Sequence, residues 1–204
     1  EAHHPVSIVT KSALVLRDLD ILADMARRRL AHVNVSITTL DRELARTMEP
    51  RASAPQRRLD TIAELVAAGI PTSVLASPMI PGLNDHELES ILERSRDAGA
   101  RSAGYILIRL PREVAKLFEQ WLETHYPRKK RRVLELIRST RDGDLYRSEF
   151  GERMTGTGPY ARLLADRFAT ARARLGLTER PAELDVTAFR RPATDAAQRS
   201  LFDP

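Results

Sequence analysis

Four short runs of β-branched and other apolar residues alternate with longer segments whose apolar positions recur at helical spacing. The predicted strands are residues 6–10, 32–38, 72–76 and 103–110. The predicted helices between them are residues 14–29, 55–68 and about 84–97, with a short helix capped by Asp41 and with Asn84 or Asp85 as the cap of the third. Strands that alternate with single helices pair in parallel through right-handed crossovers. The pattern therefore predicts an α/β fold, either half of a barrel or one side of a doubly wound sheet.

The strand pattern ends near Pro111, and the rest of the chain shows mainly helical spacing. The helices predicted there are residues 113–125, 128–141 and 158–175. The last residues contain Pro, Ala and Arg with little periodicity. We therefore predict three parts: an α/β part over 1–111, a helical extension over 112–178 and an irregular C-terminal tail over 179–204.

Composition narrows the chemistry. The chain has 204 residues, is 42% hydrophobic and carries a net charge of +5, and it has no apolar run of the roughly 18 to 20 residues that a membrane span requires. We expect a cytoplasmic protein with no membrane partner.

The chain has no cysteine, which excludes disulfides, thiolate nucleophiles and iron–sulfur ligation from within it. Its five histidines lack the spacing of metal ligands, so we predict no metal site. Because the sequence begins with Glu1 and reaches a strand within six residues, we expect it to be an internal fragment.

Polar side chains collect where the predicted parallel strands end, which is where such folds bind ligands. Lys11 follows the first strand and suits a carboxylate or phosphate, whereas Ser36 or Thr38 on the second strand suits a ribose hydroxyl. Together they indicate a nucleotide-like ligand, with ordinary loop polarity as the alternative. The loop over residues 78–83 is apolar and suits a flat ligand such as a purine, with core packing as the alternative.

Several motifs occur in order along this part of the chain. They are Ile8-Val9-Thr10-Lys11-Ser12, Leu16-Arg17-Asp18-Leu19-Asp20, Val35-Ser36-Ile37-Thr38, Met48-Glu49-Pro50-Arg51-Ala52, and Pro78-Met79-Ile80-Pro81-Gly82-Leu83-Asn84-Asp85 with Glu87. In this order they resemble the radical S-adenosylmethionine (SAM) superfamily, and within it the spore photoproduct lyase-like, or DNA repair photolyase-like, branch. The resemblance covers about residues 6–110.

The resemblance implies a six-stranded partial (β/α) TIM-like barrel, of which this chain holds the C-terminal half, family strands three to six. It also implies a lyase-like enzyme that reductively cleaves SAM to a 5′-deoxyadenosyl radical, with a possible role in DNA repair. The CxxxCxxC segment that binds the [4Fe–4S] cluster would lie in an N-terminal barrel segment outside this chain. That segment is then a required partner, and this chain alone is expected to be inactive.

Site residues follow from the same resemblance. Lys11 would contact the SAM carboxylate and Ser36 its ribose, with Thr38 as a second candidate. The segment from Ile80 to Glu87 stands at the family's fifth-strand motif and would pack on the adenine, although Pro78 replaces its first glycine. The complete expected cofactor-binding set is Lys11, Ser12, Ser36, Thr38, Met79, Ile80, Leu83 and Asn84. Glu49, Arg51 and Arg109 are candidates for the substrate mouth, with a surface salt bridge as the alternative for Glu49 and Arg51. No residue is a convincing acid–base catalyst.

A dense basic block opens the second helix of the predicted extension. It consists of Arg128, Lys129, Lys130, Arg131 and Arg132. Cations are unfavourable at a helix N-terminus, so an anion such as DNA phosphate is a candidate partner, with a solvated basic turn as the alternative. A non-catalytic nucleic-acid-binding module is therefore the rival function, and a different barrel enzyme is a second rival. Residues 198–202, Gln-Arg-Ser-Leu-Phe, resemble the short peptides that dock on bacterial sliding clamps.

Overall fold

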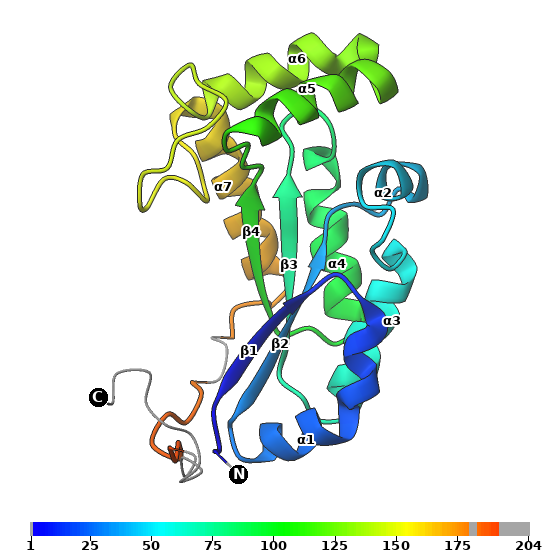
Figure 1. The fold of residues 1–204 in the computed structure, drawn as a ribbon, viewed down its shortest axis with the longest axis vertical. Helices are drawn as coiled ribbons and strands as arrows, with labels where there is room; N and C mark the ends of the chain where they lie inside the picture. Colours follow the sequence, from blue (N-terminus) through cyan, green and yellow to red (C-terminus); the bar gives the residue numbers. More distant parts are fainter. Residues whose placement is uncertain (1, 180–182, 192–204) are drawn as a thin grey trace, which may run out of the picture.

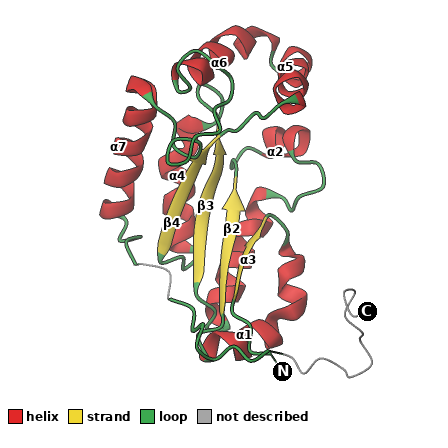
Figure 2. Ribbon diagram, turned by 60° about the vertical axis from the view of Figure 1, so that its left-hand side comes forward, coloured by secondary structure: helices red, strands yellow, loops and turns green. Residues whose placement is uncertain are grey.

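A four-stranded parallel sheet organises the molecule, as the computed structural model shows for residues 2–179 and 183–191. Its strands are β1 (Val6–Thr10), β2 (Ala31–Ile37), β3 (Thr72–Met79) and β4 (Ser102–Leu107), hydrogen-bonded in the order β1-β2-β3-β4 (Figures 1 and 2). The predicted α/β class and parallel pairing are confirmed. The arrangement is consistent with part of a TIM-like fold, in which sequential strands are neighbours.

Helices fill the connections and the C-terminal part of the chain. They are the 3-10 helices η1 (Ala13–Asp18) and η2 (Asp85–Glu87) and the α-helices α1 (Leu19–Arg27), α2 (Arg42–Met48), α3 (Pro55–Ala67), α4 (Leu88–Asp97), α5 (Glu113–His125), α6 (Pro127–Ser139) and α7 (Gly158–Arg174). No helix in the described part of the chain is both long and apolar enough to cross a membrane.

The two faces of the sheet differ in character because side chains alternate along each strand. In β2, Val33, Val35 and Ile37 are buried in one cluster with apolar side chains of α3 and α4. The residues between them are polar, and the register places similar ones beside them: Asn34 opposite Ser73, for instance. Figure 2 shows α3 and α4 on one side of the sheet. The apolar face thus packs on helices, and the opposite face carries mainly polar and small side chains.

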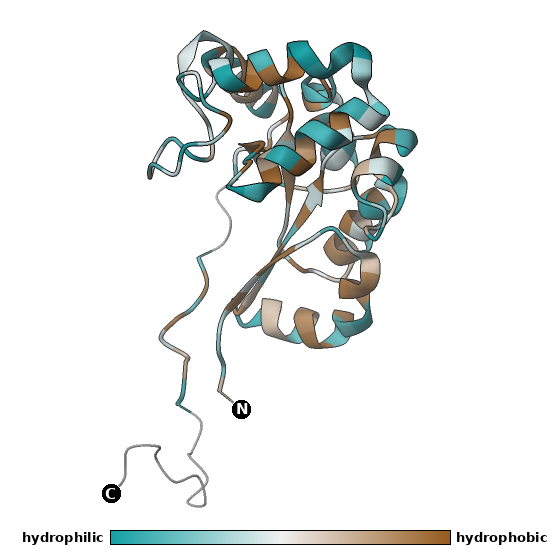
Figure 3. Cartoon of the chain, turned by 45° about the horizontal axis from the view of Figure 1, so that its top comes forward, coloured by the Kyte–Doolittle hydropathy of each residue, from teal (hydrophilic) through white to brown (hydrophobic). Residues whose placement is uncertain are grey.

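The helices of the extension pack in two different places. α5 and α6 lie across the carboxyl ends of the strands (Figure 1), where Phe118, Leu122 and Val133 form a second apolar cluster with Ile80 and Leu83. In Figure 3 the outward faces of these two helices are largely hydrophilic. α7 instead runs beside β4 and α4, where its residues pack into the first cluster. The helices after Pro111 therefore extend the core of the α/β part.

α7 is anchored by polar contacts as well. Tyr160 donates a hydrogen bond to Asp85 Oδ2 at 2.5 Å, and Arg167 forms an ion pair with Glu89 at 2.6 Å. The described part of the tail runs back to the opposite end of the sheet, where Asp185 N donates to Arg29 O at 2.9 Å. The clamp-like peptide, residues 198–202, lies outside the described residues.

Three sequence expectations about local structure are wrong. The helix expected over residues 14–29 is broken at Asp18, whose backbone angles (φ −103°, ψ 26°) leave the helical region between η1 and α1. The fourth strand ends at Leu107, since the pairing of β3 with β4 is already irregular between Ala76 and Met79. Neither Asn84 nor Asp85 caps the following helix, because both side chains bind the loop before it.

Candidate functional site

A cavity of about 620 Å³ opens at the carboxyl ends of β3 and β4, beneath α5. Lys11 and Glu49 stand at one part of its lining, Ser77 and Pro78 belong to the strand end, and Arg109 follows β4. Its other lining side chains are almost all apolar: Met48, Ile106, Leu107, Ile108, Leu110, Val114, Leu117, Phe118, Trp121 and Met154. This position is the one at which parallel α/β folds bind ligands.

A compact charged cluster forms the polar part of the lining. Lys11 Nζ donates to Thr38 Oγ1 at 3.1 Å and forms an ion pair with Glu49. Thr38 Oγ1 lies 2.7 Å from the same carboxylate and 2.8 Å from the carbonyl oxygen of Ser77. The ends of β1, β2 and β3 are therefore joined at one point by side chains from three separate segments.

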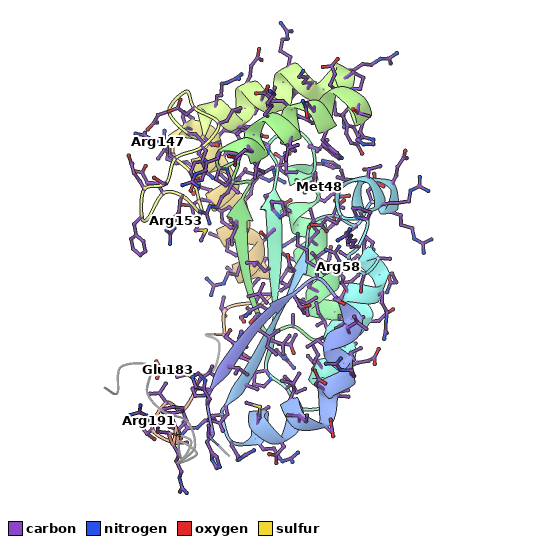
Figure 4. The ribbon with its side chains drawn as sticks, viewed as in Figure 1. Met48, Arg58, Arg147, Arg153, Glu183 and Arg191 are labelled. Atoms are coloured by element: carbon purple, nitrogen blue, oxygen red, sulfur yellow. The ribbon has the colours of Figure 1, made fainter. Side chains whose placement is uncertain are left out.

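Arg58 on α3 holds this cluster in place through its guanidinium. Its guanidinium donates to Glu49 Oε2 at 2.6 Å, to Ser53 O at 2.7 Å and to Ser36 O at 3.1 Å, and its side chain is only 2% exposed. Figure 4 labels Arg58 on α3 and Met48 at the end of α2. Arg58 thus fixes the loop that carries Glu49 against the end of β2.

The protonation state of Glu49 follows from these contacts. Burial by itself raises the pKa of the Glu49 carboxyl, but hydrogen bonds from Lys11 and Arg58 outweigh it, so the pKa lies below its ordinary value of 4.5. Glu49 is therefore a carboxylate at neutral pH. With one negative and two positive groups, the cluster of Lys11, Glu49 and Arg58 has a net charge of +1.

Among the predicted site residues, only Lys11, Glu49 and Arg109 line the cavity. Ser36 and Thr38 are buried behind it, and Ser36 Oγ donates to Ser77 O at 3.0 Å. Ser12 accepts a hydrogen bond from Leu14 N at 3.2 Å as the cap of η1. Arg51 is exposed and is not part of the lining.

The apolar loop after β3 is part of the core. The side chains of Met79, Ile80 and Leu83 are buried in the two apolar clusters and do not line the cavity. Asn84 fixes the loop from inside: its side chain accepts from Ile80 N and donates to Thr38 O, each at 2.7 Å. Ser77 and Pro78 form the floor of the cavity, and this buried loop supports them on the side away from the cavity.

Glu87 has a comparable role between two strand ends. Its carboxylate accepts hydrogen bonds from Thr39 Oγ1 and from Leu40 N, the latter at 3.1 Å. These contacts tie the loop after β2 to the segment after β3. Together with Asn84, Glu87 thus sets the spacing of the two strand ends on which the charged cluster lies.

Sequence reasoning missed Arg58 and the wall contributed by α5. The signal for Arg58 is its place on the apolar stripe of α3, in line with Ile62 and Leu65, because an arginine on a buried helix face needs polar partners. The signal for the wall is a second apolar stripe on α5, including Leu117 and Trp121. Trp121 is held by a hydrogen bond from Nε1 to Thr47 O at 3.1 Å.

The basic block lies away from this cavity, at the start of α6. Lys130 pairs with Glu123 at 2.7 Å, Arg131 lies 3.9 Å from Glu135, and the Lys129 ammonium lies 5.9 Å from the centre of the Tyr126 ring. Arg128 and Arg132 are exposed and form no ion pair with any residue that the structure describes. Part of the block is thus compensated within the chain, and two cations remain directed to solvent.

Part of the chain matches a known protein family in sequence. Residues 1–94 match the radical SAM superfamily. The match includes β1, β2, β3 and the Lys11–Glu49–Arg58 cluster, and it ends inside α4. The match supports the resemblance of the sequence motifs to this superfamily as a whole.

Curated relatives match stretches of 97 to 136 residues. An uncharacterized protein of Mycobacterium tuberculosis strain H37Rv is 34% identical over 136 residues, which are 66% of this chain and 40% of that protein. An uncharacterized protein of Methanocaldococcus jannaschii is 30% identical over 122 residues, 60% of this chain and 44% of that protein. A third, from Acidianus two-tailed virus, is 33% identical over 97 residues, 45% of this chain and 32% of that protein. The chain thus spans less than half the length of each of these relatives.

Proposed function

We propose that the full-length protein is a radical SAM enzyme of the spore photoproduct lyase-like group, and that this chain supplies its SAM-binding residues. The observation that carries the proposal is the Lys11–Glu49–Arg58 cluster, of which Lys11 and Glu49 line a large cavity; the cluster lies within the segment that matches the superfamily. When bound, SAM supplies the radical chemistry that is typical of this superfamily.

Lys11 is the residue that would hold the carboxylate of SAM. Its ammonium has three N–H donors, of which Thr38 and Glu49 accept two. The third is open to a ligand in the cavity, and the net charge of +1 favours an anion there. Glu49 and Arg58 act as positioning residues in this account, since they fix where the ammonium points.

The rest of the ligand would lie along the strand ends. Ser77 and Pro78 give the cavity a floor that is held by Ser36 and Thr38, and Ile106 contributes an apolar surface beside it. A flat base gains from contact with such surfaces by burying its faces. We therefore assign ligand contact to Pro78 and Ile106, and a supporting role to Met79, Ile80, Leu83 and Asn84.

The donor atoms of this chain do not fit an iron–sulfur cluster. The sequence has no cysteine, and the described residues include no group of three or more side chains suited to holding a metal ion. We propose that the ligands of the [4Fe–4S] cluster lie outside this chain, in the N-terminal barrel segment that the resemblance implies.

The direct test uses the full-length protein, purified without oxygen and reconstituted with iron and sulfide. After reduction with dithionite and addition of SAM, 5′-deoxyadenosine is measured by chromatography. The proposal expects it to form, and to be lost when Lys11 is replaced by Met while the unfolding temperature is retained. Replacing the exposed Lys116 by Met is the matched control. Absence of 5′-deoxyadenosine despite an intact cluster would contradict the proposal.

A second candidate function is DNA binding by α6, supported by the solvent-directed Arg128 and Arg132. It predicts binding of duplex DNA that weakens steeply with salt, because each phosphate contact releases a counterion. The double variant R128Q/R132Q should reduce the salt slope by about two, with R57Q/R94Q as the matched control. A slope unchanged by R128Q/R132Q would contradict this function.

A further inference from the structure

Arg109 is a positive charge in the cavity with no negative partner among the residues that the structure describes. Its Nη2 donates to Tyr146 Oη at 3.2 Å, and its guanidinium carbon lies 5.8 Å from the centre of the Tyr146 ring. Its Nε is buried and makes no hydrogen bond within the described residues. Buried polar groups are normally satisfied, so the Arg109 guanidinium is only partly compensated by the described residues.

A second arginine, Arg141, adds positive charge next to Arg109. Arg141 is 1% exposed, donates to Ile108 O at 3.1 Å and to Glu152 O at 2.9 Å, and forms no ion pair within the described part of the chain. Burial, and then the positive charge of Arg109, lowers the pKa of the Arg141 guanidinium. Charges removed from water are normally paired. Here two neighbouring guanidinium groups repel each other, and neither forms an ion pair with a residue that the structure describes.

The side chains around Arg109 indicate what kind of ligand the cavity would hold. From Arg109, the cavity is bounded by the apolar side chains of α5, including Val114, Leu117 and Trp121, and by Met154. Lys11, after β1, and Glu49, after α2, also line this cavity. Ligand sites are typically apolar, with a few placed polar groups that fix orientation.

We propose that Arg109 binds the phosphate or carboxylate group of the substrate, and that the apolar wall from α5 binds a ring-sized apolar part of the same molecule. The guanidinium offers two parallel donors to such a group, and the Tyr146 hydroxyl stands beside it. The term substrate rests on the proposed function. The anion site itself depends only on Arg109, Arg141 and the wall.

Calorimetric titration of the full-length protein with phenyl phosphate, benzoate and phenol tests this inference. Phenyl phosphate and benzoate distinguish the two anionic groups, and phenol supplies the ring without a full charge. We expect at least one of the two anions to bind more tightly than phenol by about tenfold or more, as for a charged hydrogen bond. Equal binding of phenol and both anions would overturn the proposal.

Variants locate the site. Arg109→Met should remove the preference for the anion, whereas Arg109→Lys should retain part of it and Tyr146→Phe should retain most of it. Lys116→Met, at an exposed residue outside the cavity lining, should leave the preference in place. A preference that persists in Arg109→Met, with folding confirmed by circular dichroism, would overturn the proposal. If SAM fails to bind while the anion preference follows Arg109, only the proposed function fails.

Discussion

The guanidinium of Arg58 lies 2.6 Å from the carboxylate of Glu49, in an ion pair whose side chains are 2% and 11% exposed. This pair joins α3 to the loop after α2, and Glu49 in turn holds Lys11 at the end of β1. Residues far apart in the sequence thus set the position of one ammonium group. The position of Lys11 therefore depends on Glu49, whose carboxylate is in turn held by the buried guanidinium of Arg58.

Replacing Arg58 by Met should destabilise the protein strongly. Removing one partner of a buried ion pair leaves the other charge without compensation, which typically costs about 3–5 kcal/mol in the free energy of unfolding. Urea denaturation followed by circular dichroism measures it. The control is Arg57→Met, on the same helix, where an exposed ion pair with Glu64 is worth under about 1 kcal/mol. Similar losses in the two variants would refute the role assigned to Arg58.

Acid should remove the contribution of Glu49. Because the pKa of Glu49 in the folded protein lies below its ordinary value of 4.5, its stabilising effect is complete above that value. The effect declines as the pH falls through the lower folded value. We therefore expect Glu49→Gln to be less stable than the wild type at neutral pH, and the difference in unfolding free energy to shrink below pH 4.5. A difference that stays constant down to about pH 2 would contradict this.

Two glycines with similar backbone conformations should respond differently to alanine. Gly156 and Gly143 both have positive φ, at 76° and 98°. A Cβ at Gly156 would lie 2.8 Å from Thr140 O, whereas at Gly143 it would meet nothing within 4 Å. Gly143→Ala should therefore cost about 1–2 kcal/mol for the left-handed conformation alone. Gly156→Ala should cost more, as measured by thermal unfolding, and equal costs would show that the contact at Thr140 relaxes freely.

The sheet was predictable because its signals are local. Alternation in residues 32–38 and the repeated strand–helix order indicate a parallel sheet, and they need no knowledge of distant contacts. The break at Asp18 and the end of β4 at Leu107 were not predictable in the same way. They depend on tertiary packing and on an irregular pairing with β3, which the strand pattern alone does not contain.

The candidate site was predictable only in part. The strand-end rule finds Lys11 and Arg109, because it depends on where strands stop. It also selects Met79 and Ile80, because an apolar loop at a strand end suits a flat ligand, but their side chains are buried in the core. Arg58 escapes the rule because it lies in the middle of a helix and reaches the site through its side chain.

Calorimetric titration of SAM into the full-length protein tests the central claim most directly, namely that Lys11 holds the SAM carboxylate. Losing a hydrogen bond between two charged groups typically costs about 1.5–3 kcal/mol, which predicts a roughly 10- to 100-fold weaker affinity for Lys11→Met than for the wild type. Lys116→Met should bind like the wild type. Unchanged affinity of a folded Lys11→Met variant would contradict the claim.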